Sequence, residues 1–306
     1  MLAELNKPIE IDPREIVDDS ELSYFIENGF VLPKVGLPEA DAAALRETIE
    51  QVFRDNPDWA GIVRMPHVPV RPGQLEGVIG GEELFKIAVH PTLIAAASRL
   101  IGKNLILWGG EIFAKPAGTG KRTPWHQDCY NPAVKAGAGR PFPRSVMIWI
   151  AVDDVDAENG CLRFIPGSGR SGRLDHVQVQ HTRDLLNFEV DAECISDKAI
   201  NGVRPSGFYS CHDLFVLHGA NANISGRRRA GLTFHYMAAE DVYDRSFGSA
   251  SGSGRDKPAP LADRPIWLVL GENKDPLNDF TRGHQNLEDL DELAEATRQK
   301  LTQQFT

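Results

Sequence analysis

The feature that most constrains the fold is a change in hydrophobic periodicity at about Leu105. From there on, short β-rich runs follow one another with clusters of Gly, Pro and Asp between them. These runs cover residues 105–115, 145–152, 161–165, 214–217 and 231–237. No helical pattern alternates with them, which argues against a parallel α/β sheet, where a helix joins each strand to the next. The sequence therefore predicts an antiparallel sandwich or barrel, with a jelly roll as the natural candidate.

Helical patterns flank this β-rich region on both sides. Before it, apolar residues recur at spacings of three and four, and Pro and Gly stand where helices start and stop. After it comes a loop rich in Gly, Ser and Pro over residues 246–265, which could close over a site, and then a polar helical stretch. The expected helices cover residues 21–26, 38–55, 91–101 and 287–303.

The length of 306 residues allows one domain or two, because β barrels of roughly 200 to 250 residues routinely form one domain. We expect a single domain over residues 1–306, mainly β with flanking helices. Residues 1–104 would form an N-terminal helical support, residues 105–240 the β core, and residues 241–306 a loop and a C-terminal helix.

Charge and targeting signals narrow the range of partners. The chain has 43 acidic and 33 basic residues and a formal charge of −10, which repels nucleic acid and anionic lipid. It has no apolar run long enough to span a membrane, and its start lacks the features of a signal peptide. Its four cysteines are widely spaced and form no CxxC pair, so reduced thiols are expected. We expect a cytoplasmic protein with no nucleic-acid or membrane partner, of undefined oligomeric state.

The segment Thr123–Asp128, TPWHQD, carries the most chemical information. On an extended chain, residues i and i+2 project to the same side, so His126 and Asp128 would aim an imidazole nitrogen and a carboxylate oxygen at one point. His218 follows an apolar run 90 residues after Asp128 and offers a third ligand. Two histidines and one carboxylate on one face of a metal leave the opposite positions open, which is the ligand set of non-haem iron(II) oxygenases.

An HxD pair alone is a weak signal, because a histidine hydrogen-bonded to a nearby acid gives the same pattern. Arg229 strengthens it, since it lies 11 residues after His218 at the start of the next β-rich run. A guanidinium returned to that place would bind a carboxylate through two hydrogen bonds. His212 and Asp213 form another His-Asp pair, in which we interpret Asp213 as a turn acceptor and His212 as no metal ligand.

Together these motifs resemble the phytanoyl-CoA dioxygenase family of iron(II)- and 2-oxoglutarate-dependent oxygenases. The resemblance runs from about residue 21 to residue 237 and rests on separated motifs in matching order: residues 28–31, 125–128, 159–168, His218-Gly219 and Arg229. It implies a double-stranded β-helix, that is, a cupin-like jelly-roll barrel, in agreement with the strand pattern. It also implies an oxidoreductase that uses iron(II), 2-oxoglutarate and dioxygen, and that forms succinate and CO2.

The resemblance assigns roles residue by residue. His126, Asp128 and His218 would hold iron and act as the catalytic centre, while Arg229 would bind the distal carboxylate of 2-oxoglutarate. Three further residues stand where relatives often have cosubstrate-pocket residues: Lys115, Gln127 and Trp149.

Two positions bear on the chemistry. Many relatives have a small hydroxyl residue two positions after the distal histidine, and this chain has Ala220, so one hydrogen bond to the cosubstrate would be missing. Halogenating relatives replace the carboxylate ligand by a small residue. Because Asp128 is present, hydroxylation or a related oxidation is favoured over halogenation.

Adjacency to the metal motif is the only guide to substrate contacts. Trp125, Tyr130 and Asn131 are candidates for this reason. Five basic residues also surround the motif and would attract an anionic substrate if some point inward: Lys121, Arg122, Lys135, Arg140 and Arg144. Arg144 is included among the candidate substrate residues. We expect a small-molecule substrate whose identity the sequence does not define.

The leading hypothesis is thus a dioxygenase that hydroxylates, or otherwise oxidises, an unactivated C–H bond of a small metabolite. Zinc and manganese also accept imidazole and carboxylate ligands, so a dioxygen-independent isomerase or hydrolase on a cupin-type barrel is an alternative. A non-catalytic barrel that only binds a small molecule is another.

Overall fold

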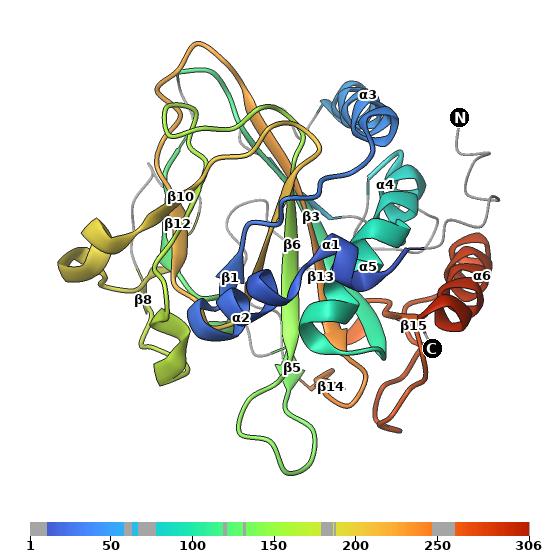
Figure 1. Ribbon diagram of the computed structural model, residues 1–306. Helices are drawn as coiled ribbons and strands as arrows, with labels where there is room; N and C mark the ends of the chain where they lie inside the picture. The colour runs from blue at the N-terminus through green and yellow to red at the C-terminus, as the bar shows by residue number, and fades with distance from the viewer. Residues whose placement is uncertain are drawn as a thin grey trace.

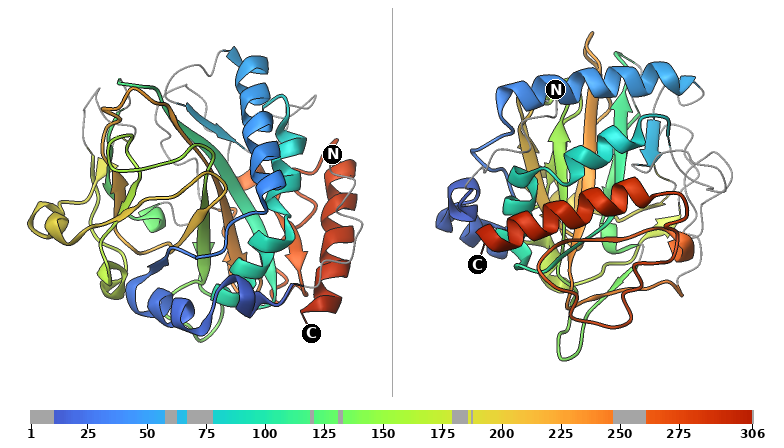
Figure 2. Two further views of the ribbon diagram at one scale, coloured as in Figure 1. Left: turned by 45° about the horizontal axis from the view of Figure 1, so that its top comes forward. Right: turned by 90° about the vertical axis from the view of Figure 1, so that its right-hand side faces the viewer.

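The computed structural model describes residues 11–57, 63–66, 78–118, 121–130, 133–178, 186, 188–246 and 261–305. Within them, a seven-stranded sheet faces a four-stranded sheet, and helices cover the outer face of the larger sheet (Figures 1 and 2). Neighbouring strands pair in the antiparallel sense, including the central pairs of both sheets. The predicted fold class, mainly antiparallel β with flanking helices, is confirmed.

The larger sheet has the order β1-β11-β6-β13-β3-β15, and β2 also pairs with β3. Its strands are β1 (Phe30–Val31), β2 (Val63–Pro66), β3 (Leu105–Lys115), β6 (Ser145–Ala151), β11 (Tyr209–Asp213), β13 (Arg229–Ala238) and β15 (Trp267–Leu270). The smaller sheet has the order β10-β7-β12-β4, made by β4 (Thr123–His126), β7 (Leu162–Phe164), β10 (Ile200–Gly202) and β12 (His218–Ala220). Two short strand pairs complete the described β structure: β5 (Val134–Lys135) with β14 (Val242–Tyr243), and β8 (Val177–Gln178) with β9 (Phe188–Glu189).

The helices of the described residues are α1 (Pro13–Ile16), α2 (Asp19–Asn28), α3 (Glu39–Asp55), α4 (Gly81–Ala88), α5 (Pro91–Ile101) and α6 (Glu288–Gln304). A side-chain cap starts α1, α2 and α5. A capping box of Asp18 and Glu21 starts α2, and Gly29, with φ of 79°, ends it in the left-handed conformation. In the right-hand view of Figure 2, α3, α5 and α6 cross in front of the larger sheet. The predicted helices are confirmed, and α1 and α4 are additional.

Strand alternation gives the larger sheet two different faces. On β6, Ile148 and Ile150 pack with the helices in the main apolar core, while Trp149 packs with residues of the smaller sheet, among them Phe164. The side between the sheets also holds buried polar side chains, including that of Arg229. Buried polar side chains are therefore found between the two sheets, and a functional site is expected there.

Two further predictions can be compared with the described residues. Cys129, Cys161 and Cys211 are free and buried, as expected, and the side chain of Cys194 lies outside the described residues. Residues 247–260 of the expected loop also lie outside them. In the same part of the chain, no single helix has the length and apolar composition needed to cross a membrane; α4 and α5 meet that criterion only as a pair bent by 51°.

The strand predicted over residues 214–217 is wrong. This run is a turn between β11 and β12, and it carries the chain from the larger sheet to the smaller one. The carboxylate of Asp213 accepts hydrogen bonds from the backbone N–H groups of Phe215 (2.8 Å) and Val216 (2.7 Å), which closes the turn. Leu214, Val216 and Leu217 are apolar because they are buried, not because they form a strand. The prediction that Asp213 is a turn acceptor is confirmed.

We expect Asp213→Ala to lower the free energy of unfolding by about 1–3 kcal/mol, because two partly buried N–H groups lose their acceptor. Denaturant unfolding followed by circular dichroism measures this. Asp154→Ala is the matched control, since Asp154 is exposed and accepts one backbone hydrogen bond, from Ser206. Equal losses in both variants would contradict the role of Asp213.

Candidate metal centre

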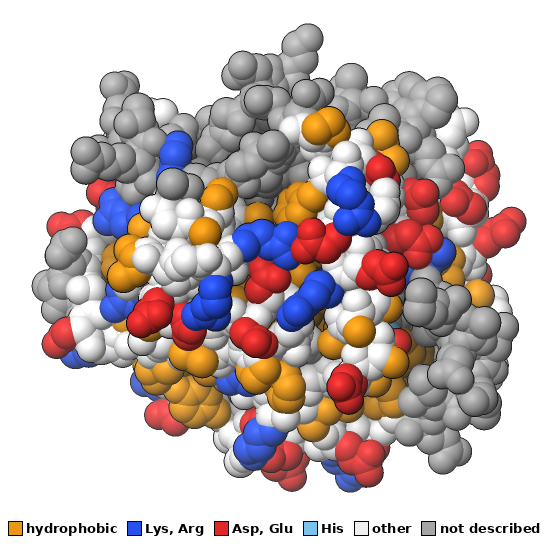
Figure 3. All heavy atoms as spheres, turned by 90° about the horizontal axis from the view of Figure 1, so that it is seen from above, with side chains coloured by type: hydrophobic (Ala, Val, Ile, Leu, Met, Phe, Trp, Pro, Cys, Tyr) orange, Lys and Arg blue, Asp and Glu red, His pale blue; other side chains and the backbone are white. Residues whose placement is uncertain are grey.

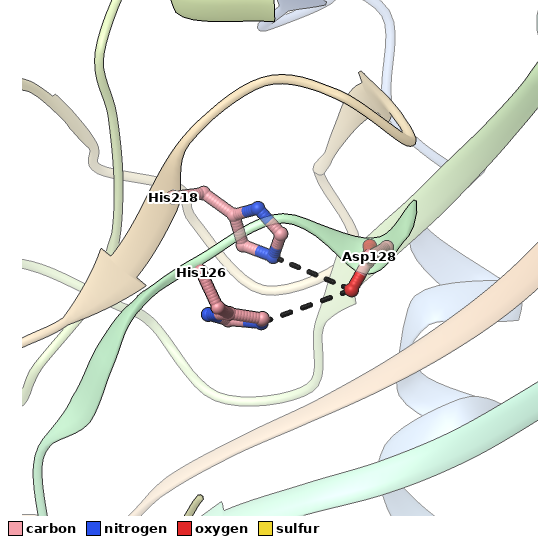
Figure 4. A group of neighbouring side chains, drawn as sticks. All are labelled: His126, Asp128 and His218. Atoms are coloured by element: carbon pink, nitrogen blue, oxygen red, sulfur yellow. Dashed lines mark ion pairs between the residues drawn. The ribbon is translucent and has the colours of Figure 1, made fainter. Parts of the chain in front are cut away.

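His126, Asp128 and His218 come together between the two sheets (Figure 4). His126 ends β4 and His218 begins β12, and the two residues are direct partners across the smaller sheet. Asp128 Oδ1 lies 3.7 Å from His126 Nε2 and 3.8 Å from His218 Nε2. One donor atom from each residue lies within 4.8 Å of the others, so a single metal ion can bind all three.

The local conformation at Asp128 differs from the expected extended chain. β4 ends at His126, and Asp128 is the first residue of a 3₁₀ turn, Asp128–Tyr130. The predicted i, i+2 alternation is therefore wrong in detail, although the two side chains do converge. The turn that joins β11 to β12 holds this 3₁₀ turn in place, because the N–H of Cys129 donates to the carbonyl of Leu214 (2.9 Å).

Both imidazoles of the centre are held in the tautomer that a metal requires. His126 Nδ1 lies 2.9 Å from the carbonyl oxygen of Pro124, and His218 Nδ1 lies 3.1 Å from that of Val216. A carbonyl only accepts, so each Nδ1 carries the hydrogen and each Nε2 keeps a lone pair. Burial lowers the pKa of both histidines, which keeps them neutral.

The carboxylate of Asp128 has a different environment at each oxygen. Oδ1 faces His126 and His218, whereas Oδ2 lies 3.2 Å from Nε2 of His212, a residue of β11. Burial of Asp128 favours the neutral form, but the imidazoles of His218 and His212 outweigh it and hold the pKa of Asp128 well below its ordinary range. Asp128 is thus an anion at neutral pH.

Arg229, the first residue of β13, is a buried cation. Its side chain is 2% exposed, and its guanidinium carbon lies 4.6 Å from the ring centroid of Trp149. Among the described residues its Nε has no hydrogen-bond partner, and no carboxylate forms an ion pair with it. Burial lowers the pKa of Arg229 to about 10, so it still carries its charge at neutral pH. A buried charge of this kind is stabilised by an incoming carboxylate.

A glycine in β13 makes room for the ring below that guanidinium. A Cβ atom at Gly231 would lie 1.9 Å from Cζ2 of Trp149, a distance that no side chain tolerates. Glycine in a strand interior commonly marks such a close approach. The absence of a side chain at Gly231 therefore lets the ring of Trp149 pack against the guanidinium of Arg229.

Asp153 binds the residues on both sides of Arg229, Arg228 through its side chain and Ala230 through its backbone. Its carboxylate accepts hydrogen bonds from Arg228 Nε (3.0 Å) and Arg228 Nη2 (2.9 Å) and from the backbone N–H of Ala230 (2.8 Å). Arg228 is thereby held at the surface while Arg229 turns inward. Sequence reasoning missed Asp153, because only its partners, far away in the chain, reveal its role.

Lys115 is paired in register with Arg229 and is fully buried. Its ammonium group donates to the carbonyl oxygens of Ala220 (3.3 Å) and Asn221 (2.5 Å), which follow His218 in the chain. In the structure Lys115 therefore supports the end of β12. Its predicted contact with a cosubstrate, like that of Trp149, stays a prediction.

Gln127 is buried, and its amide is bonded to the protein. Nε2 donates to the carbonyl oxygens of Gly172 (3.0 Å) and Phe215 (2.5 Å), and Oε1 accepts from the N–H of Leu174 (2.7 Å). The backbone N–H of Gln127 donates to Nε2 of His176 (3.0 Å). A cosubstrate contact of Gln127 stays a prediction, and it would have to replace one of these bonds.

The candidate substrate residues are spread over the molecule. Alternation on β4 turns Trp125 away from His126. The guanidinium carbon of Arg163 lies 5.1 Å from the ring centroid of Trp125. Trp125 also lines a small surface pocket of about 160 Å³. Arg144 lies near Ala238, at the end of β13 opposite Arg229. Asn131 and the side chain of Tyr130 lie outside the described residues.

The basic residues around the metal motif are largely neutralised by carboxylates. The ion pairs are Arg122–Glu189, Lys135–Asp244, Arg140–Asp241 and Arg144–Glu240. The face seen in Figure 3 likewise shows acidic and basic side chains intermixed. These pairings give no support to the predicted attraction of an anionic substrate.

Two facing antiparallel sheets with two histidines and a carboxylate converging between them define a jelly-roll protein built for a mononuclear metal. A family model described as phytanoyl-CoA dioxygenase (PhyH) matches residues 25–231. The chain belongs to the phytanoyl-CoA dioxygenase family, as the motifs predicted.

Curated relatives agree with this family. The chain is 25% identical to the peroxisomal phytanoyl-CoA dioxygenase of Bos taurus over 237 residues, which are 72% of this chain and 68% of the relative. It is 28% identical to L-proline trans-4-hydroxylase of Streptomyces griseoviridis over 239 residues, 71% and 85% of the two chains. With ectoine dioxygenase of Bordetella bronchiseptica, the identity is 25% over 247 residues, 72% and 76% of the two chains. At the level of the family, the predicted enzyme class of dioxygenase or hydroxylase is confirmed.

Solved structures show the same fold. The apo form of the non-heme monooxygenase ThoJ matches with a TM-score of 0.60 and 22% identity, over 93% of this chain and 98% of that chain. EctD from S. alaskensis with 2-oxoglutarate and 5-hydroxyectoine matches with a TM-score of 0.58 and 18% identity, over 84% and 92%. The predicted jelly-roll fold is confirmed.

We expect the chain to bind one divalent ion and Asp128→Ala to weaken this binding by more than about 100-fold, since even residues that only support a ligand contribute 10–100-fold. Equilibrium dialysis with Mn²⁺ measures the affinity. Asp154→Ala, an exposed aspartate, is the control and should bind as the wild type does. Unchanged binding by Asp128→Ala would show that the ion sits elsewhere.

Proposed function

We propose that this chain is an iron(II)- and 2-oxoglutarate-dependent dioxygenase that hydroxylates a small molecule. In this proposal His126, Asp128 and His218 bind iron, and Arg229 binds the distal carboxylate of 2-oxoglutarate. The observation that carries it is that a three-donor metal cluster and a buried guanidinium, which forms no ion pair among the described residues, lie within one barrel. Supporting this, structures of similar fold are described as EctD with bound Fe and as EvdO2 complexed with 2-oxoglutarate.

The residues present fit ferrous iron. Two neutral imidazoles and one carboxylate oxygen form the facial ligand set that leaves positions open for other ligands. When bound, iron and 2-oxoglutarate supply the oxidation, in which dioxygen, 2-oxoglutarate and a C–H bond become succinate, CO2 and an alcohol. The protein holds the imidazoles through Pro124 and Val216 and buries both of them between the two sheets, while the side chain of Asp128 stays 24% exposed.

Arg229 is expected to supply most of the binding of the cosubstrate carboxylate. Lys115, its partner in register, has its ammonium group engaged by two backbone carbonyls. Ala220 is buried and offers no hydroxyl group. The charge of Arg229 and its stacking on Trp149 therefore have to account for most of the affinity for the distal carboxylate.

A small, weakly charged metabolite is the substrate class that we favour. Two of the three relatives described above are named for proline and ectoine, which are small molecules. Because most of the basic residues near the motif are paired with carboxylates, attraction of an anion receives no support from them. An anionic substrate, hydroxylation or a related oxidation in preference to halogenation, and a cytoplasmic location stay predictions.

The direct test is anaerobic loading with iron(II) and 2-oxoglutarate, followed by oxygen and a panel of small amino-acid-like metabolites. We expect substrate-stimulated succinate release, abolished in His126→Ala. Arg229→Gln should raise the KM for 2-oxoglutarate about 10- to 100-fold, as expected when a charged hydrogen-bond partner is lost. Arg227→Gln is the control, because Arg227 lies two residues before Arg229, is half-exposed and pairs with Asp156. Metal-dependent turnover without dioxygen would instead support the isomerase or hydrolase alternative.

We also expect Asp153→Asn to raise the KM for 2-oxoglutarate by about 3- to 10-fold, since loss of a charge-assisted hydrogen bond loosens the backbone around Arg229. Mn²⁺ affinity and kcat at saturating cosubstrate should stay unchanged. Steady-state kinetics at varied 2-oxoglutarate measure this, with Asp154→Asn as the matched control. A fall in kcat with no change in KM would refute the positioning of Arg229 by Asp153.

A further inference from the structure

His212 is a buried histidine at the metal centre that is not a member of the three-residue donor cluster. It lies in β11, on the side of the larger sheet that faces the smaller sheet, and it is 3% exposed. Its ring centroid is 4.4 Å from that of His218 and 5.5 Å from that of Phe164. These neighbours hold the ring in one place, so it acts as a rigid wall beside Asp128.

The contact of His212 with Asp128 is directional. Nε2 lies 3.2 Å from Asp128 Oδ2, and because a carboxylate only accepts, Nε2 carries the hydrogen. Oδ1, the other oxygen, is the one that lies 3.7 Å and 3.8 Å from the Nε2 atoms of His126 and His218. The two oxygens of Asp128 therefore have different partners. Oδ1 faces the metal position, and Oδ2 accepts a hydrogen bond from His212.

Backbone hydrogen bonds of adjacent residues also link the segments that carry His212 and Asp128. Asp213, next to His212, closes the turn at the end of β11 and donates its N–H to the carbonyl of Gly29 (2.9 Å). Leu214, one residue further, accepts the N–H of Cys129, which follows Asp128 (2.9 Å). The distance between His212 and Asp128 is thus set by main-chain contacts, which makes their hydrogen bond a fixed part of the centre.

Packing alone does not account for an imidazole at this position. Among the described residues, His212 Nδ1 is buried and has no hydrogen-bond partner. A buried polar atom without a partner is destabilising, and an aromatic residue would fill the same space between aromatic neighbours without this penalty. The Nε2–H contact with Asp128 is the one interaction of His212 that a phenylalanine could not make.

We propose that His212 is a positioning residue that keeps Asp128 a one-oxygen metal ligand. This inference rests on the proposed function, in which three protein donors and a bidentate keto acid leave one position for dioxygen. If both oxygens of Asp128 were free, the carboxylate could take that position as well. His212 prevents this by engaging Oδ2.

The test compares His212→Phe, which keeps an aromatic ring without the donor, with the amide pair His212→Gln and His212→Asn. The Gln amide reaches about as far as Nε2 of histidine, whereas the Asn amide reaches only as far as Nδ1. We expect Phe and Asn to weaken Mn²⁺ binding about 10- to 100-fold, the usual effect of losing a partner of a metal ligand, and Gln to restore most of it. Ser210→Ala, a buried residue on the same strand and face, is the control and should bind Mn²⁺ normally.

The absorption spectrum of the Co²⁺-loaded protein provides a readout that a merely structural role would not change. We expect it to report a higher coordination number in His212→Phe and a wild-type spectrum in His212→Gln. Thermal unfolding of each variant establishes that it is folded, and the amide pair allows the comparison if His212→Phe does not fold. Wild-type affinity and spectrum in folded His212→Phe or His212→Asn would overturn this inference alone, whereas a wild-type chain that binds neither ion would overturn the proposed function.

Discussion

The metal centre depends on contacts that join the two sheets. His126 and His218 are paired across the smaller sheet, while His212, which holds Asp128, belongs to the larger sheet. The turn closed by Asp213 connects the strands that carry His212 and His218. A shift of one sheet against the other would therefore separate Asp128 from at least one imidazole, so the geometry of the centre is set by the packing of the whole barrel.

Charge balance divides the interior into two regions with opposite needs. Asp128 accepts a hydrogen bond from His212, and its other oxygen and the Nε2 lone pairs of His126 and His218 converge on one point. Arg229 is buried without a carboxylate partner among the described residues, and burial lowers its pKa. One region is thus prepared for a cation and the other for an anion. A molecule that carries both a metal-chelating group and a distant carboxylate satisfies both regions at once.

The sequence predicted those features that depend mainly on residues close together in the chain. Gly29 and Gly102 mark helix ends in the structure as in the sequence, and the spacing of His126, Asp128, His218 and Arg229 identified residues that the fold brings together or buries. The errors arose where a partner far along the chain decides the outcome. Residues 214–217 are apolar like a strand but form a turn because Asp213 accepts their N–H groups. The roles of His212 and Asp153 depend on residues 84 and 75 positions away, which no single-sequence pattern reveals.

Substrate selection in this enzyme depends on which charged groups near the metal motif are still unpaired. Charges that are already paired across the surface cannot also attract a ligand over a distance, and four of the five basic residues around the metal motif are paired. In the proposed function, Arg229 binds the cosubstrate. Selectivity should therefore arise from shape and from hydrogen bonds close to the metal ligands. In that case substrate analogues that differ in shape near the oxidised carbon should be discriminated more strongly than analogues that differ in net charge.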